Sequence, residues 1–546
     1  MGLRIIPLSG VEEVGKNCTI LEFNSEIIII DLGLDFPNQD MPGIEYLLPD
    51  ITYLEKNKKR IKGLILTHGH LDHIGGIPYV LERLGNPRIF ATPLTMGLVQ
   101  DRLSEIGFKN PNLNLINPDY SFSLGSFKIN PFRVVHNIPD SVGLIIETPL
   151  GIVVCTGDFK FDSHPVDQKP LDEEKLRRFA QNGILALLSD STNATLPGKA
   201  VSEKEVGEGI EKIIRDAHNS RVIFTTFSTL ISRIQQLIYA ARKNNRKIAL
   251  VGYSIKKNIQ IAHDLGYLNV SSADLINLNK PEDIDNYPNN RIIILAAGAQ
   301  GVEGSSMAKI SENKHWLIKI RRGDTIVMSS STIPGNEFAI HQMMDGLIDQ
   351  GAKTIYQASL GLGLHSSGHA YQEDLKMMIK IVRPKFFIPV HGEHYMQAEH
   401  IELAKEMGIK KENCFMLFNG EILEIDDLKR AKVVSKKKLA NSLMAVESDK
   451  AVILNEETMR LRQRMAESGV CALSVSHQDK KKLNFEIVFS GLSIEAILVE
   501  EIKNKAGKLI KKYGLNNQAR ERIKISLGDF LLNKTGKKPV IILFVS

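Results

Sequence analysis

Four residues of types that bind metal ions stand within one short stretch: His68, His70, Asp72 and His73. The stretch follows an apolar, strand-like run at residues 64–66, so the four side chains are expected on a loop at a strand end. His68 and His70 can point to one ion, whereas Asp72 and His73 lie around the turn and can serve a second ion. Imidazole and carboxylate groups suit zinc or manganese. A polar turn explains any one of these residues, but the order HxHxDH favours a metal site.

Other His and Asp residues stand just beyond further apolar, strand-like runs: Asp31, His136, Asp158 and His391. A buried carboxylate is costly unless it is paired, so we expect Asp31 to orient metal ligands from behind, with a turn or helix cap as the alternative. Asp158 could bridge two ions. A lone His or Asp is more often structural, but these residues repeat the strand-end placement of the HxHxDH stretch.

A second polar set could bind an anion. His365, Ser366, Ser367 and His369 surround Gly368 and offer several hydrogen-bond donors. Such donors suit a phosphate group, whereas a plain polar loop is the alternative.

The elements that must position these residues alternate between helix and strand. The residue pattern predicts a hairpin at 18–30, helical and extended segments in turn from 77 to 106, and strands that end near His136 and Asp158. From about residue 202 the rhythm of strand, helix and strand predicts a second, parallel α/β unit. After Asp426 a basic, polar stretch predicts a linker. A small C-terminal domain follows, with helices at 458–467, 494–513 and 519–534 and strands at 471–476, 485–490 and 540–545.

Length and composition bound the protein class. The chain has 546 residues, 43% hydrophobic and 24% charged residues and a net charge of +6, which is ordinary for a soluble protein of two or three domains and permits a polyanionic partner. Its four cysteines form no CxxC pair, so a reducing compartment fits. With no targeting segment and no apolar run of about 20 residues, we expect a cytoplasmic protein without a membrane span.

These motifs resemble a known family. The chain is similar to metallo-β-lactamase-fold proteins with an inserted β-CASP domain, and within them to ribonuclease J. The resemblance covers nearly the whole chain and is carried by residues 67–76, 136–143, 156–162, 188–193, 329–337, 365–370 and 390–393. It implies an α/β fold, with an αββα sandwich at 1–203 and 357–428, a β-CASP domain at 204–356, a linker at 429–450 and an α+β domain at 451–546.

The resemblance also implies roles for single residues. One zinc ion would be held by His68, His70, His136 and Asp158, and the other by Asp72, His73, Asp158 and His391. Manganese is an alternative metal, and Asp31 would support the ligands. Asp190 and His369 resemble a proton-handling acid and a phosphate-stabilising imidazole, while His365, Ser366, Ser367, Gly368 and His369 look like a substrate-phosphate loop. A structural calcium ion near Gly43, Glu45 and Asp449 is a further, weaker expectation.

The function implied is hydrolysis of single-stranded RNA from the 5′ end, with internal cuts, by a two-metal mechanism. Ser228, Thr229 and Ser331 could complete a pocket for a 5′-monophosphate. Residues 228–230 and 301–306 depart from the family pattern, which bears on end recognition rather than on hydrolysis. Dimers or tetramers through the C-terminal domain are expected. The alternatives are a non-catalytic RNA-binding subunit, which would have lost metal ligands, and a small-molecule metallohydrolase.

Overall fold

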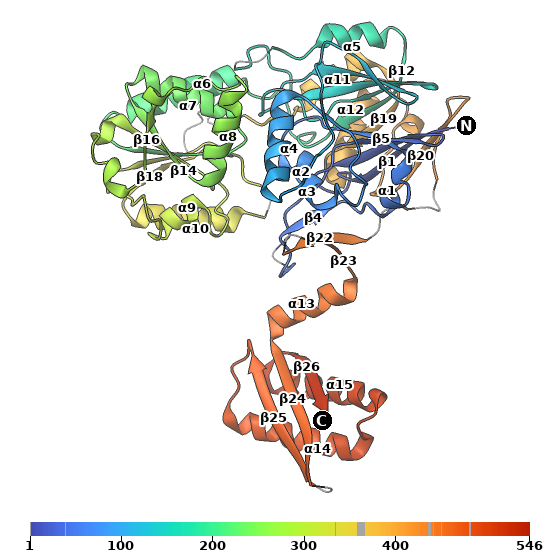
Figure 1. Cartoon of the computed structure of the whole chain (residues 1–546), viewed down its shortest axis with the longest axis vertical. Coiled ribbons are helices and arrows are strands. Elements are labelled where there is room, and N and C mark those ends of the chain that lie inside the picture. Colours follow the sequence, from blue (N-terminus) through green and yellow to red (C-terminus); the bar gives the residue numbers. More distant parts are fainter. Residues whose placement is uncertain are drawn as a thin grey trace. The chain divides into compact units, whose positions relative to one another are not determined.

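The computed structural model describes residues 2–38, 40–166, 169–333, 335–356, 366–434, 438–439, 442–448, 450–479 and 482–545. The chain forms two compact units (Figure 1). The larger unit combines Met1–Asp35 with Leu48–Asn441, and the smaller unit combines Phe36–Leu47 with Ser442–Ser546. His365 and Asp449, which the sequence analysis singled out, lie outside the described residues.

Two mixed sheets form a sandwich in the larger unit. The first has the order β21-β20-β1-β2-β3-β5-β6-β7 and the second the order β19-β12-β11-β10-β9-β8. The strands of the first sheet are β1 (Gly2–Ser9), β2 (Cys18–Phe23), β3 (Glu26–Ile30), β5 (Ile61–Ile65), β6 (Ile89–Ala91), β7 (Leu113–Leu115), β20 (Leu423–Asp426) and β21 (Ala431–Val433). Those of the second are β8 (Phe122–Leu124), β9 (Phe127–Arg133), β10 (Val142–Thr148), β11 (Gly151–Cys155), β12 (Ile184–Asp190) and β19 (Pro384–Val390).

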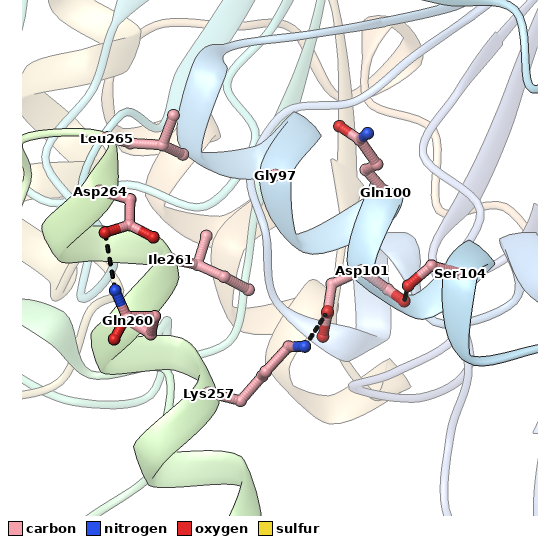
Figure 2. Close-up of a pocket in the computed structure, with 9 residues that line it drawn as sticks. All are labelled: Gly97, Gln100, Asp101, Ser104, Lys257, Gln260, Ile261, Asp264 and Leu265. Carbon is pink, nitrogen blue, oxygen red and sulfur yellow. Dashed lines mark hydrogen bonds and ion pairs between the residues drawn. The ribbon is translucent and has the colours of Figure 1, made fainter.

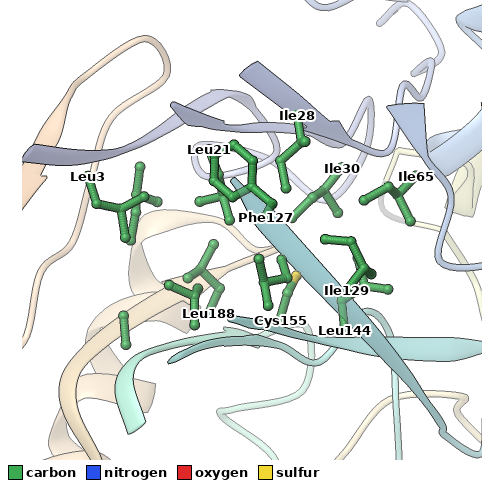
Figure 3. Close-up of a cluster of buried hydrophobic side chains, with 14 of the residues drawn as sticks. Leu3, Leu21, Ile28, Ile30, Ile65, Phe127, Ile129, Leu144, Cys155 and Leu188 are labelled. Carbon is green, nitrogen blue, oxygen red and sulfur yellow. The ribbon is translucent and has the colours of Figure 1, made fainter. Parts of the chain in front are cut away.

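The inner faces of the two sheets share one hydrophobic core (Figure 3). Leu21, Ile28 and Ile30 of the first sheet pack in the same cluster as Ile129 and Leu144 of the second. All four isoleucines of β3 are buried, because that strand is covered on both faces, which explains its continuous β-branched run. The core therefore fixes the strands whose ends carry the predicted ligands.

Helices cover the outer faces of the sandwich. A second apolar cluster joins the outer face of the second sheet to α5 (Glu173–Ala180), α11 (Gln372–Val382) and α12 (His394–Glu406). On the first sheet, α4 (Pro93–Glu105) packs on β6 and β7 and contacts α3 (Ile77–Val80). The remaining helices of this part are α1 (Thr52–Lys56) and α2 (Leu71–Ile74). The predicted layered α/β sandwich is confirmed.

The segment inserted between β12 and β19 forms a parallel sheet of its own, with the order β15-β14-β16-β13-β17-β18. Helices α6, α7 and α8 lie on one side of it and α9 and α10 on the other (Figure 1). The bounds are α6 (Glu203–Asp216), β13 (Val222–Thr225), α7 (Ile231–Lys243), β14 (Lys247–Val251), α8 (Tyr253–Asp264), β15 (Leu275–Ile276), β16 (Ile292–Ala296), α9 (Ser306–Ser311), β17 (Thr325–Met328), α10 (Glu337–Asp349) and β18 (Lys353–Ile355). The predicted second parallel α/β unit is confirmed.

The insertion contacts the sandwich where α8 meets α4 (Figure 2). Lys257 of α8 forms an ion pair with Asp101 of α4, at 2.8 Å between Nζ and Oδ1. Gly97 allows the approach, because a Cβ there would stand 2.9 Å from Leu265 Cδ1. An open cavity of about 430 Å³ lies between the two helices.

The smaller unit contains two three-stranded sheets, β23-β22-β4 and β25-β24-β26. Their bounds, with those of the helices, are β4 (Tyr46–Leu48), β22 (Leu443–Glu447), β23 (Lys450–Leu454), α13 (Glu456–Ser468), β24 (Val470–Asp479), β25 (Lys482–Ser490), α14 (Ala496–Tyr513), α15 (Asn517–Thr535) and β26 (Val540–Val545). The predicted C-terminal helices and strands are thus present. One feature differs from expectation: the stretch predicted as a linker contains β21 and β22. Among the described helices, none is long and apolar enough to cross a membrane.

Candidate metal centre

The predicted ligands lie just beyond the carboxyl ends of strands. Parallel strands bring these ends to one edge of a sheet. Asp31 follows β3, His68 and His70 lie between β5 and α2, Asp158 follows β11, and His391 follows β19. β3 and β5 pair in parallel, as do β11, β12 and β19. Asp31 and His391 have left-handed backbone conformations, with φ of 60° and 52°, so each side chain turns sharply away from its strand.

Three imidazoles form the first group of donors. His70 Nδ1 lies 3.1 Å from His68 Nε2 and 3.0 Å from His136 Nε2. Around one tetrahedral zinc ion, Zn–N bonds of 2.0–2.1 Å place nitrogen atoms about 3.3 Å apart, so the spacing of this group is close to that of a zinc site.

The second group is formed by Asp72, His73, Asp158 and His391, whose donor atoms all lie within 4.8 Å of one another. His391 Nε2 is 3.1 Å from Asp72 Oδ2, and His73 Nε2 is 3.2 Å from Asp158 Oδ2. The same Asp158 oxygen lies 3.6 Å from His68 Nε2 and 3.8 Å from His136 Nε2 of the first group. One carboxylate oxygen therefore faces both groups and can be shared between two cations.

The electrostatics of the two groups differ. Burial lowers the pKa of His68 and His136 well below the usual value and that of His70 to about 4, so these imidazoles are neutral, as metal ligands must be. Burial also lowers the pKa of His391, but Asp158 and Asp72 outweigh it and raise that pKa to about 9. Protons thus balance the carboxylates of Asp72 and Asp158 here, and a cation would take their place. The donor set fits a pair of metal ions.

Asp31 contacts Thr67 and His73 behind the second group of donors. Its Oδ1 accepts the backbone N–H of Thr67, and its Oδ2 accepts the Thr67 hydroxyl, each at 2.8 Å. Asp31 Oδ2 also lies 2.8 Å from His73 Nδ1. Because Nδ1–H donates to Asp31, Nε2 of His73 is left facing the donor group.

Two supporting residues were missed by the sequence reasoning. Thr192 donates its hydroxyl proton to Asp190 Oδ1. The Thr192 hydroxyl oxygen lies 2.7 Å from His391 Nδ1, so this oxygen accepts the imidazole N–H and leaves His391 Nε2 for the centre. Asn17 Nδ2 lies 3.1 Å from both the Asp72 carbonyl oxygen and His73 Nε2. Neither residue belongs to a ligand motif. For Thr192, the short spacing from Asp190 after an apolar strand was the available signal.

The return segment from the insertion closes the centre. His136 Nδ1 donates to the Gly368 carbonyl oxygen over 2.8 Å, and His369 Nδ1 lies 2.8 Å from Asp190 Oδ2. A Cβ at Gly368 would stand 2.5 Å from the His136 ring, so only glycine permits this approach. The side chain of His369 is 18% exposed. Burial lowers its pKa, but Asp190 and Asp158 outweigh burial and raise it.

The predicted substrate residues fall in different places. Ser228 and Thr229 follow β13 and Ser331 follows β17, two neighbouring parallel strands, so their loops lie at one sheet edge. Ser367 Oγ accepts from Asn193 Nδ2 over 2.6 Å. Ser366 differs from expectation: it is only 1% exposed, and its hydroxyl accepts from Lys160 Nζ and donates to the Val201 carbonyl oxygen. A buried hydroxyl with both partners inside the protein is not presented to a ligand.

The cavity between α4 and α8 and the predicted calcium site do not contain such groups of metal-binding side chains among the described residues. The cavity lining contains none of the predicted ligands. Glu45 Oε1 accepts the backbone N–H of Ser448 over 3.1 Å, and Glu45 belongs to no group of metal-binding side chains among the described residues.

Four protein-family models together match most of the chain. Residues 11–182 match the metallo-β-lactamase superfamily, 219–347 the β-CASP domain of ribonuclease J, 363–417 the RNA specificity domain of Zn-dependent metallo-hydrolases, and 457–546 the ribonuclease J C-terminal domain. A protein of unknown function from Enterococcus faecalis has a crystal structure that covers 78% of this chain and 100% of its own, with a TM-score of 0.52 and 15% identity. That likeness supports the fold alone.

Relatives match over longer stretches and at higher identity. Ribonuclease J of Synechocystis is 40% identical over 87% of this chain and 73% of its own length. Ribonuclease J2 of Bacillus subtilis is 34% identical over 99% of this chain and 98% of its own, and ribonuclease J of Thermus thermophilus is 35% identical over 99% and 94%. With identity of this level along nearly the full length of two relatives, and with donor groups at the strand ends where the resemblance expected them, the chain belongs to the ribonuclease J family.

Proposed function

We propose that this metal-dependent ribonuclease holds two zinc ions and hydrolyses single-stranded RNA from a 5′-monophosphate end, with cuts also at internal positions. The observation that carries the proposal is the single Asp158 oxygen that faces two donor groups, at 3.6 Å from His68 Nε2 and 3.2 Å from His73 Nε2. The match of residues 363–417 to an RNA specificity domain of Zn-dependent metallo-hydrolases supports both the metal and the substrate.

In this proposal, one ion would be held by His68, His70, His136 and Asp158. The other would be held by Asp72, His73 and His391, again with Asp158, and manganese is the alternative metal. When bound, such a pair supplies Lewis acidity and a nucleophile at neutral pH for in-line displacement at phosphorus. The protein's own part is to orient the imidazole rings so that one nitrogen of each faces the centre, which the contacts from Asp31, Thr192 and Gly368 achieve.

His369 and Asp190 are proposed to handle the proton and the phosphate charge. Asp190 occupies His369 Nδ1, so Nε2 is the nitrogen that can reach a phosphate oxygen. The raised pKa of His369 favours an imidazolium, which can stabilise the developing charge and donate a proton to the departing oxygen.

RNA would reach the centre along the carboxyl edge of the inserted sheet. We propose that Ser228, Thr229 and Ser331, together with Ser367, Gly368 and His365 of the return segment, contact the RNA phosphates. A pocket closed by these residues accepts a 5′-monophosphate and rejects a triphosphate by size and by unpaired charge. We also propose that the protein assembles into dimers or tetramers through the C-terminal domain and is cytoplasmic. The proposed domain boundaries lie near residues 203, 356, 428 and 450.

The test combines elemental analysis with RNA decay. Purified protein is expected to contain two zinc ions per chain and to degrade 5′-monophosphorylated RNA faster than 5′-triphosphorylated RNA of the same sequence. The same analysis reports whether calcium is bound near Gly43 and Glu45. Hydrolysis of carboxylic esters but not of RNA would favour a small-molecule hydrolase, and RNA binding without hydrolysis would favour a non-catalytic subunit.

A further inference from the structure

A cluster of four charged side chains is buried where the inserted domain joins the sandwich. Lys160, Arg233, Glu203 and Asp162 are 0%, 1%, 3% and 7% exposed. Lys160 Nζ lies 3.0 Å from Glu203 Oε1, and Arg233 Nη2 lies 3.3 Å from Glu203 Oε2. Asp162 Oδ2 is 3.8 Å from Lys160 Nζ. Two positive and two negative charges therefore balance within the cluster.

Stability alone does not account for these charges. Burial of ions is costly, and a buried ion pair is often no more stabilising than apolar side chains of the same volume. Burial raises the pKa of Glu203, but Arg233 and Lys160 outweigh it and lower the pKa to about 2, so Glu203 is ionised at neutral pH. Fixed charges with several hydrogen bonds specify one arrangement of the segments they join.

The cluster contacts both segments of chain that connect the sandwich with the inserted domain. Lys160 belongs to the loop of Asp158 and donates to Ser366 Oγ over 2.8 Å, in the segment that returns from the insertion. On the outgoing segment, Asp162 Oδ2 accepts the backbone N–H of Glu203 over 2.8 Å, at the start of α6. Arg233 of α7 donates to Ser329 Oγ, beyond β17 of the inserted sheet.

The returning segment is the one that closes the metal centre. Two residues after Ser366, the Gly368 carbonyl oxygen orients His136, and His369 contacts Asp190. A displacement of Ser366 would therefore also displace Gly368, which orients His136, and His369, the proposed proton donor. A misplacement of about 1 Å can reduce a rate roughly 100-fold.

We propose that Lys160, Glu203 and Arg233 are positioning residues, which hold the segment of Ser366 to His369 in register with the metal centre. Ser366 is their contact point in that segment and binds no RNA phosphate. The inference rests on the proposed function in one respect, namely that His369 serves RNA hydrolysis.

The first experiment replaces Ser366 by Ala, which removes one hydroxyl and no charge. The kcat for RNA is expected to fall about 10-fold to 100-fold, whereas the KM and the metal content stay unchanged, because the anchor of the segment is lost but no substrate contact or metal ligand is. Ser311→Ala is the matched control, since Ser311 is also buried and donates to the Ala308 carbonyl oxygen within α9. This control is expected to retain the wild-type kcat.

The second experiment separates positioning from charge balance. Lys160→Met leaves one positive and two negative charges, Glu203→Gln leaves two positive and one negative, and the double variant leaves one of each. The thermal midpoint is expected to fall in both single variants and to recover in the double variant. The kcat should not recover with it, because no ammonium donor to Ser366 is restored.

Several results would overturn the inference. A wild-type kcat in Ser366→Ala would do so, as would a raised KM with unchanged kcat, which would make Ser366 a substrate contact. Recovery of kcat together with the thermal midpoint in the double variant would reduce the cluster to a structural role. If the charge variants fail to fold, Ser366→Ala decides alone. Failure of the wild-type protein to hydrolyse RNA with added metal would instead overturn the proposed function, so the two failures are distinguishable.

Discussion

Replacing Asp31 by Asn tests how the centre controls the protonation of a metal ligand. Asp31 is 4% exposed, and its carboxylate accepts hydrogen bonds from the Thr67 N–H and from His73 Nδ1. Asn keeps the shape and tolerates the left-handed backbone at this position, where φ is 60°. Its amide oxygen can still accept the Thr67 N–H, which leaves the NH₂ group facing His73. Since Nδ1 must then accept, the proton moves to His73 Nε2, the nitrogen that faces Asp158 and Asp72.

The expected magnitude follows from that tautomer change. Loss of a partner behind a metal-ligating histidine costs 10-fold to 100-fold in metal affinity or activity, which is about 1.4–2.8 kcal/mol. The effect should fall on the group of Asp72, His73 and His391 rather than on the group of His68, His70 and His136. We therefore expect the Asp31→Asn protein to retain close to one zinc ion per chain at a zinc concentration that fills both sites of the wild type. Its RNA hydrolysis should recover partly at high zinc.

The assay measures zinc per chain after dialysis at fixed free zinc and RNA hydrolysis against added zinc. Asp50→Asn is the control, because Asp50 is 6% exposed and its Oδ1 accepts the Thr52 N–H over 2.9 Å. Wild-type zinc binding and rate in Asp31→Asn would refute the reasoning, and equal losses in both variants would show only that buried Asp residues are sensitive.

Further predictions concern the ligands, the return segment and the RNA end. His70→Ala should lose RNA hydrolysis and about one metal ion per chain. Its far-UV circular dichroism should change little, because His70 lies on a loop of a packed sandwich. Retained RNA cleavage would contradict the assignment of His70 as a metal ligand. Gly368→Ala should reduce kcat and destabilise the protein by about 1–3 kcal/mol, since its Cβ would stand 2.5 Å from the His136 ring, and a thermal melt with wild-type values would count against this. Ser228→Ala with Thr229→Ala should slow exonucleolytic decay of monophosphorylated RNA more than internal cleavage; equal slowing of both would refute the pocket.

The local elements could be predicted where one residue pattern decides the structure. β2 and β3 occupy residues 18–23 and 26–30 as expected, because the apolar run covers a strand buried on both faces and Asn24 adopts the left-handed turn with φ of 54°. The terminal strand β26 was likewise predicted at residues 540–545. The HxHxDH stretch predicted a group of donors, since residues so close in sequence must lie close in space.

Contacts between distant segments could not be predicted from patterns. Asn17 meets His73, and Lys160 meets Ser366, across 56 and 206 positions of sequence, and nothing in the local sequence of either residue records its partner. The pairing of β4 with β22 joins a stretch near residue 46 to the smaller unit, for the same reason. Ser366 was expected to face a phosphate because it belongs to a compact set of hydrogen-bond donors around Gly368, whereas in the structure its hydroxyl contacts Lys160 Nζ and the Val201 carbonyl oxygen.

The most direct test of the two-metal account is titration of metal-free protein with zinc while RNA hydrolysis is measured. We predict no hydrolysis without metal, a rise in rate with added zinc, and saturation at two zinc ions per chain, because Asp158 serves both donor groups. Hydrolysis of RNA by protein shown to be free of metal, or a rate that saturates at one ion per chain, would contradict the account.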